Sequence, residues 1–141
     1  MIRQKIVLPE YDGWNIYCYY AVTHYAVDEI MDRLHSIHCD RKSLRKAYRN
    51  LSKGEINTGL CYSNYERGET VLVIALTSCA AEFINSWHHE LEHFESHICE
   101  AYGLDPKGEE IAYLSGDIAM EMFPKIKHLI CDCCRSEQYG R

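Results

Sequence analysis

Apolar and polar positions alternate along this chain with two different periods, and each period predicts a different element. Residues 14–22 alternate with a period of two, which is typical of a strand with one face buried. Residues 25–39 instead repeat their apolar positions every three to four residues, which predicts a helix. Residues 40–54 continue as a second helix, for which Asp40 can serve as the N-cap and Gly54 as the stop.

The middle of the chain carries the signals of a hairpin. Residues 57–64 and 70–76 are rich in residues that favour strands, and the connection between them contains a glycine suited to a tight turn. We therefore predict two antiparallel strands here. The second of them, residues 70–76, is our candidate for the edge of the sheet, where an extended peptide could add as a further strand.

Two more helices follow the hairpin. Residues 77–103 predict a long helix that is capped by Thr77 or Ser78 and ends at a glycine. Residues 108–123 predict another helix, which ends before Pro124 because the residue preceding a proline disfavours the helical conformation.

The order of these elements defines the expected fold class. Two helices follow the first strand, and two more follow the hairpin, so the sheet should be small and antiparallel or mixed, with helices packed on one side. This is an α+β arrangement. At 141 residues the chain has the length of one domain, and we expect residues 1–141 to form a single unit.

Charge bears on the partners that the chain can bind. The formal net charge of −6 argues against a dedicated nucleic-acid binder. Six of the fifteen basic residues nevertheless fall on the second predicted helix: Arg41, Lys42, Arg45, Lys46, Arg49 and Lys53. The simpler interpretation is a solvated helix face, and the alternative is a docking patch for an acidic partner or a nucleic-acid backbone.

The start of the chain and its cysteines both bear on the compartment in which the protein is expected. The start of the chain lacks the apolar stretch of a signal peptide, and no segment reaches the roughly 20 apolar residues of a spanning helix. We expect a cytoplasmic protein with no membrane partner, whose eight cysteines are mostly reduced. The CDCC segment at 131–134 could bind a soft metal through thiolates, although packed or reactive cysteines are the preferred interpretation.

The strongest chemical signal lies in the long helix, where His89, Glu90 and His93 spell H-E-x-x-H. Residues four apart lie one above the other on a helix, so the two imidazoles can bind one ion. Glu90 lies beside that face and can act as the general base on a metal-bound water. This pattern predicts a zinc site with a catalytic glutamate, against the simpler alternative of a histidine-rich surface helix.

The remaining histidines of this helix are poorer ligands. His89, His93 and His97 together span about 12 Å of helix, so all three cannot bind the same ion. We expect His97 to support the site, to face a substrate or to be exposed. His88 should point to another side of the helix.

A zinc site needs at least a third protein ligand, and the next helix offers two carboxylates. Glu109 shares a helix face with the small residues Ala112 and Gly116, which would permit close approach to the histidine helix. Glu110 lies on a bulkier and more polar face. We favour Glu109 as the third ligand and keep Glu110 as the alternative.

The HELEH segment, the turn and the E109-x-x-A112 segment together resemble the gluzincin clan of zinc metallopeptidases. The stretch that leads into HELEH also resembles small zincin-like proteins of bacterial mobile elements and phages. The resemblance covers about residues 58–123 and implies a minimal zincin-like domain, a bound zinc ion and peptide-bond hydrolysis. Tyr113 and His128 are the candidates for stabilising the transition state.

Three functional hypotheses follow from the sequence. The first is a zinc-dependent metallopeptidase acting on a peptide or protein substrate, with His89, His93 and Glu109 as ligands and Glu90 as general base. The alternative is a catalytically inactive zincin-like module that binds a protein partner. The third is a surface helix that binds no metal.

Overall fold

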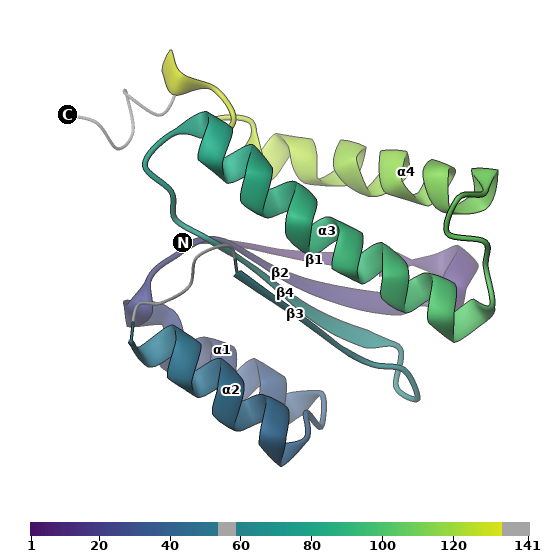
Figure 1. Cartoon of the computed structure of the whole chain (residues 1–141), viewed down its shortest axis with the longest axis horizontal. Helices are drawn as coiled ribbons and strands as arrows, with labels where there is room; N and C mark the ends of the chain where they lie inside the picture. Colours follow the sequence, from purple (N-terminus) through teal and green to yellow (C-terminus); the bar gives the residue numbers. More distant parts are fainter. Residues whose placement is uncertain (54–58, 134–141) are drawn as a thin grey trace.

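The computed structural model describes residues 1–53 and 59–133 and consists of one sheet with helices on both of its faces (Figure 1). The elements in chain order are β1 (Ile2–Leu8), β2 (Trp14–Val22), α1 (Val27–Ser36), α2 (Arg41–Ser52), β3 (Gly59–Asn64), β4 (Glu69–Ala75), α3 (Ala80–Tyr102) and α4 (Glu109–Ile126). Short 3-10 turns precede β2 and α1. The sheet is mixed, so the predicted α+β class with a small mixed sheet is confirmed.

The order of strands across the sheet is β1-β2-β4-β3. β1 and β2 are antiparallel, β2 and β4 are parallel, and β3 and β4 form the predicted antiparallel hairpin. The expectation that residues 70–76 form an edge strand is therefore wrong. β4 lies inside the sheet, as befits an apolar run that is buried on both faces, and the edges are β1 and β3.

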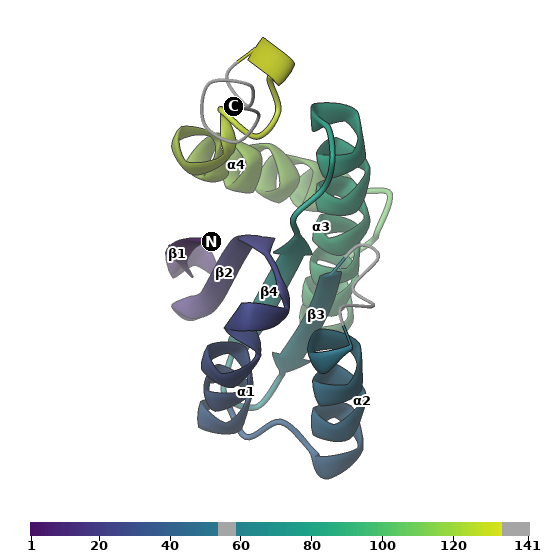
Figure 2. The same cartoon turned by 90° about the vertical axis from the view of Figure 1, so that its left-hand side faces the viewer.

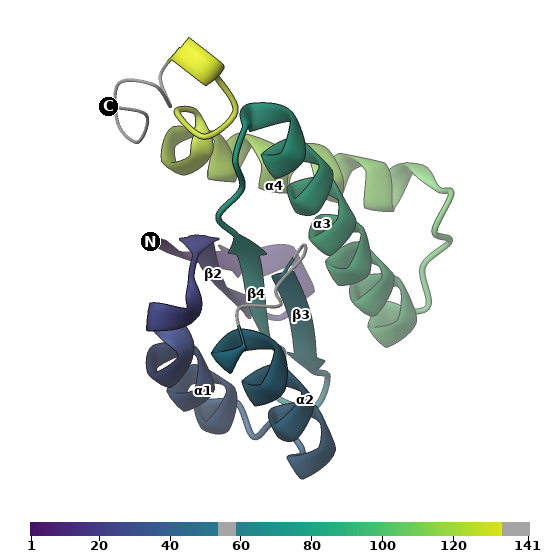
Figure 3. The same cartoon turned by 60° about the vertical axis from the view of Figure 1, so that its left-hand side comes forward.

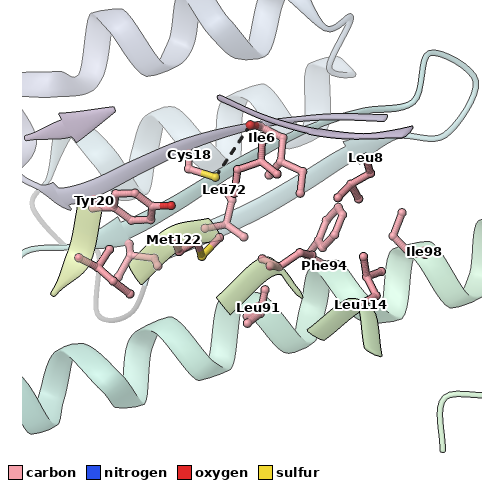
Figure 4. Close-up of a cluster of buried hydrophobic side chains, with 14 of the residues drawn as sticks. Ile6, Leu8, Cys18, Tyr20, Leu72, Leu91, Phe94, Ile98, Leu114 and Met122 are labelled. Carbon is pink, nitrogen blue, oxygen red and sulfur yellow. Dashed lines mark hydrogen bonds between the residues drawn. The ribbon is translucent and has the colours of Figure 1, made fainter. Parts of the chain in front are cut away.

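Two separate hydrophobic cores cover the two faces of the sheet. On one face, Phe94 and Ile98 of α3 and Met122 of α4 pack against Cys18 and Leu72 of the strands (Figure 4). On the other face, α1 and α2 cover the intervening side chains of β2 and β4, and Figure 2 shows these helices opposite α3 and α4. The expectation of helices on one side only is wrong, because parallel pairing of β2 with β4 requires a crossover that brings α1 and α2 over the second face.

β1 is an element that the pattern analysis did not assign. Its register sets Ile6 opposite Ile16 and Leu8 opposite Trp14, and all four of these side chains are buried. Only the second half of the strand alternates clearly between buried and exposed positions. Such a short alternation is a weak signal in a single sequence.

Two of the predicted helix ends agree with the structure, whereas the start of α3 and the end of α4 do not. The Asp40 carboxylate accepts a hydrogen bond from the Ser43 amide at 2.9 Å, which confirms it as the N-cap of α2. The predicted stop at Gly54 lies outside the described residues. α3 begins after Cys79 rather than at Thr77 or Ser78, and it ends as predicted at Gly103, which adopts a left-handed conformation.

The helix α4 passes through Pro124 and ends at Ile126, so the prediction that it ends before the proline is wrong. Proline removes one amide donor, and only Lys125 and Ile126 of the helix follow it. Ile126 and Leu129 are buried and fix this last turn against the core.

Two further observations concern membrane-spanning helices and cysteines. Within residues 1–53 and 59–133, no helix has both the length and the apolar character that crossing a bilayer requires. The seven cysteines in these ranges are free thiols. Cys134, the last residue of the CDCC segment, lies outside the described residues.

Candidate metal centre

The helix α3 positions the three residues of the H-E-x-x-H pattern. Leu91, Phe94 and Ile98 are buried against the sheet, and this apolar stripe fixes the rotation of the helix about its axis. His89 and His93 consequently lie on an exposed ridge, whereas Glu90 is only 3% exposed. The pattern is therefore split between an accessible imidazole pair and a buried carboxylate.

The two imidazoles of the pattern face each other. The Nε2 atom of His93 lies 3.2 Å from the Nε2 atom of His89, and the rings meet edge to face with their centroids 4.8 Å apart. Two ring nitrogens that bind the same tetrahedral zinc ion, each at about 2.1 Å, lie about 3.4 Å apart. The separation of this pair thus fits two ligands of a single ion.

A cleft of about 380 Å³ opens beside this pair. Most of its lining comes from α2, α3 and the edge strand β3, which lies between the two helices in Figure 3, and Leu34 of α1 and Cys39 complete it. α3 contributes His89, Glu90 and His93, while β3 contributes the segment 59–62. The pattern residues therefore line a concave surface next to the free edge of a sheet.

Glu90 lies close to Cys61 at the β3 side of this cleft. Burial raises the pKa of the Cys61 thiol well above its ordinary value, and the Glu90 carboxylate raises it further. Cys61 therefore remains a neutral thiol beside the carboxylate. A thiol in this state is a weak hydrogen-bond donor that does not compete with Glu90 for a proton.

Glu109 lies at a different level of the helices from the imidazole pair, so the structure does not bring the predicted third ligand to that pair. Two contacts show which residues of α3 and α4 lie at the same level. The Trp87 indole donates to the sulfur of Met122 at 3.2 Å, and Glu95 lies beside Ser115. At 1.5 Å of rise per residue, these levels put Glu109 on the order of 15 Å along the helices from the pair. The physical reason is the length of α3, which continues to Tyr102 before the chain turns back.

The alternative ligand, Glu110, faces a different part of the molecule. It lies near Tyr11, where burial raises the pKa of the phenol and the charge of Glu110 adds to that rise. The structure brings together His89, Glu90 and His93 but neither Glu109 nor Glu110. Among the residues that the structure describes, no group of three His, Cys, Asp or Glu side chains is arranged to hold a metal ion. The histidine pair fits an ion, and the three-ligand set does not.

His97 turns toward the sheet instead of joining the pair. Its Nδ1 atom lies 2.7 Å from the Ser63 hydroxyl, which lies 2.7 Å from the hydroxyl of Thr70. Thr70 in turn accepts a hydrogen bond from the Trp14 indole at 2.8 Å. Burial lowers the pKa of His97, and the nearby His93 lowers it further. His97 is thus linked to the sheet through Ser63 and Thr70, one helical turn beyond the imidazole pair.

A second hollow lies on the other side of the imidazole ridge, between α3 and α4. It is lined by His89 and His93 together with Glu92 and Glu95. Burial raises the pKa of Glu95, Glu92 adds to the rise, and one of its carboxyl oxygens is buried without a hydrogen-bond partner in the described structure. These glutamates therefore give the ridge an acidic flank.

The proposed transition-state groups lie elsewhere. Tyr113 is 70% exposed on α4, and His128 follows the end of that helix. The cleft that contains Glu90 is lined by residues of α1, α2, β3 and α3 and by Cys39, and neither candidate is among them.

The sequence interpretation missed the opposite wall of the cleft. Ser43, Lys46 and Asn50 of α2 line it, across from the metal pattern. Their spacing of three and four residues is a helical signal that was available, but nothing in the sequence indicates which face of α2 meets α3. That information comes from the position of β3 at the edge of the sheet.

Comparison with known proteins adds no assignment to this geometry. No model of a protein family, no curated protein and no solved structure matches the chain.

Proposed function

We propose that this chain is a zincin-like, metal-dependent hydrolase of peptide bonds that acts in the cytoplasm. The observation that carries the proposal is the 3.2 Å separation of the His89 and His93 ring nitrogens, beside a buried glutamate in a cleft. His89 and His93 would hold a divalent ion, with zinc as the expected metal. A zinc ion bound there would supply a polarised water at neutral pH.

Glu90 is the residue that would move the proton. Its carboxylate lies within the same cleft as the imidazole pair, one residue along α3 from His89. From there it would accept a proton from the attacking water and pass it to the amine that leaves. The buried position of Glu90 would keep bulk water away from this transfer.

The substrate would be held by the backbone of β3. This strand is at the edge of the sheet, and its segment 59–62 lines the cleft beside the histidines. An extended peptide can add to such an edge through main-chain hydrogen bonds. A peptide in that position would run past the imidazole pair and Glu90.

A second candidate function is a module that binds a protein partner without cleaving it. The distance between Glu109 and the imidazole pair favours this candidate, because catalytic zinc sites normally have three protein ligands. In that case the cleft and the edge of β3 would serve for binding alone. Glu109 is therefore not part of the proposed metal site.

The Glu90→Gln variant separates the two candidates. The amide keeps the size of the carboxylate but cannot accept a proton, so we expect equal zinc binding and a loss of cleavage of roughly 10²–10⁴-fold. Zinc is measured by metal analysis of dialysed protein, and cleavage is measured by mass spectrometry of a random peptide library. A wild-type protein that binds zinc and peptide but cleaves nothing would favour the binding module. Undiminished cleavage by the variant would remove Glu90 from the mechanism.

A further inference from the structure

The wall of the cleft that faces the imidazole pair carries positive charge. Lys46 lines it from α2 and is exposed, with Ser43 and Asn50 on either side of it along the same helix face. These three side chains offer one cation and two groups that form hydrogen bonds. Such a wall suits an anionic or strongly polar ligand rather than an apolar one.

Lys46 is the basic residue among the described side chains that line the cleft, whereas Arg41, Arg45, Arg49 and Lys53 of the same helix line a separate hollow beside α1. Residues 41–53 contain six basic residues and no acidic one, whereas the whole chain has a net charge of −6. The ion pairs between described side chains, Arg3 with Glu29 and Arg67 with Glu69, involve none of these six. The positive charge of α2 is therefore not neutralised by ion pairs within the part of the chain that the structure describes.

The edge strand β3 bounds the cleft beside this wall. Strand β3 lies between α2 and α3 (Figure 3). Its alternate side chains pack against two different hydrophobic cores. Cys61 packs toward α3, whereas Leu60 and Tyr62 pack toward α2. A peptide added to this edge would also divide its side chains, with one set toward Lys46 and the other toward the histidines.

From this juxtaposition we propose that the cleft recognises an extended acidic segment of a polypeptide. Its backbone pairs with the edge of β3, and one set of its Asp or Glu side chains faces Lys46. The proposal deepens the proposed function by naming its substrate class, and it rests on that function only for cleavage. A nucleic acid has no backbone that can extend a sheet.

Binding to the Glu90→Gln protein tests the proposal, because a bound peptide would not be consumed. The probes are three fluorescent peptides of identical length: one rich in Asp and Glu, one with the matching amides, and one rich in Lys. Fluorescence anisotropy should show that the acidic peptide binds at least tenfold more tightly than the amide peptide. The affinity should fall as salt is raised from 50 to 300 mM, and N-methylation of alternate peptide amides should abolish binding.

A charge reversal on the cleft wall supplies the matched comparison. Lys46→Glu should weaken the acidic peptide at least tenfold, whereas Lys125→Glu, at an exposed position on α4, should leave its affinity unchanged. Both variants change the net charge equally, so a general electrostatic effect would weaken both alike and would overturn the proposal. Lys46→Met, with thermal unfolding measured in parallel, separates loss of the charge from loss of the fold.

The remaining outcomes distinguish this proposal from the proposed hydrolase. Equal binding of acidic and amide peptides, together with cleavage by the zinc-loaded wild type, would overturn acidic recognition and leave the hydrolase intact. Tight binding of the acidic peptide without cleavage would do the reverse. Stronger binding of single-stranded DNA than of the acidic peptide, with the same dependence on Lys46, would overturn the proposal in favour of a nucleic-acid surface.

Discussion

The Nδ1 atom of His97 lies 2.7 Å from the hydroxyl oxygen of Ser63, which connects the third imidazole of α3 to the sheet. His97 lies one turn beyond His93 and would be the simplest extension of the metal pattern. Its contact with Ser63 instead directs one of its two ring nitrogens toward β3. Two imidazoles of α3 are thus left facing each other, and the third supports their surroundings.

Metal binding should therefore depend on two histidines alone. We expect His89→Ala and His93→Ala to lose the bound zinc, and His97→Ala to keep it, because only the first pair has ring nitrogens that can share an ion. Glu109→Ala should also keep it, given the distance of this residue from the pair. Isothermal titration of metal-free protein with zinc measures these affinities. Loss of zinc from the Glu109 variant would mean that metal binding draws α4 along α3.

The buried carboxyl of Glu95 should make stability depend on pH. Burial raises its pKa in the folded state above the ordinary 4.5, so the folded protein holds this proton more tightly than the unfolded chain does. Stability from this group is complete below pH 4.5 and is lost as pH rises through the folded-state pKa. We expect Glu95→Gln to unfold at a higher temperature than the wild type at pH 7.5, with a difference that shrinks toward pH 4. Glu66→Gln, on an exposed turn, is the control that should not change this profile.

The start of α3 should depend on Asp132, a residue 52 positions further along the chain. The Asp132 carboxylate accepts a hydrogen bond from the Ala80 amide at 3.0 Å, while Cys79 supplies no side-chain cap. We expect Asp132→Ala to lower the free energy of unfolding by about 1 kcal/mol, the usual effect of losing a cap. Urea denaturation measures the change. Asp117→Ala, at an exposed site on α4, should stay within about 0.5 kcal/mol of the wild type.

The first residue of β3 should tolerate no side chain. Gly59 has a φ of +146°, and a Cβ atom there would lie 1.7 Å from the carbonyl oxygen of Val73. We expect Gly59→Ala to destabilise the protein by more than about 2 kcal/mol, since the strand pair would have to separate. Gly116→Ala is the matched comparison, because a Cβ on this helical residue meets nothing within 4 Å. That change should raise stability by about 0.5–1 kcal/mol, and equal effects of the two would contradict the geometry.

Local patterns were sufficient to locate most of the elements of this fold. The period of the apolar residues located both helix pairs, and Asp40 and Gly103 marked helix ends correctly. The arrangement of those elements was less accessible. Whether β4 is central or at an edge depends on its pairing with β2, and no local feature of residues 70–76 reveals a partner so distant in the chain.

In the candidate site too, features within one helix could be predicted from the sequence, whereas the relative position of two helices could not. The spacing of His89 and His93 is set by one turn of a single helix, so their mutual approach could be predicted from the sequence. The position of Glu109 depends on the relative offset of two helices. The predicted end of α3 at Gly103 already implied that the chain turns back about 15 Å beyond His93. The matching motif suggested a ligand that this helix length does not bring to the pair.

The parallel pairing of β2 with β4 has a consequence for the order in which the chain folds. Asn15 and Glu69 are partners although they are 54 residues apart, whereas β1 with β2 and β3 with β4 are local hairpins. Closing so long a loop costs entropy before any contact compensates for it, so the two hairpins should form first and meet late. During synthesis, β2 leaves the ribosome well before β4 exists. Until β4 pairs with it, one edge of β2 has unpaired backbone groups. Such an edge can pair with another chain, so aggregation is the expected hazard at that stage.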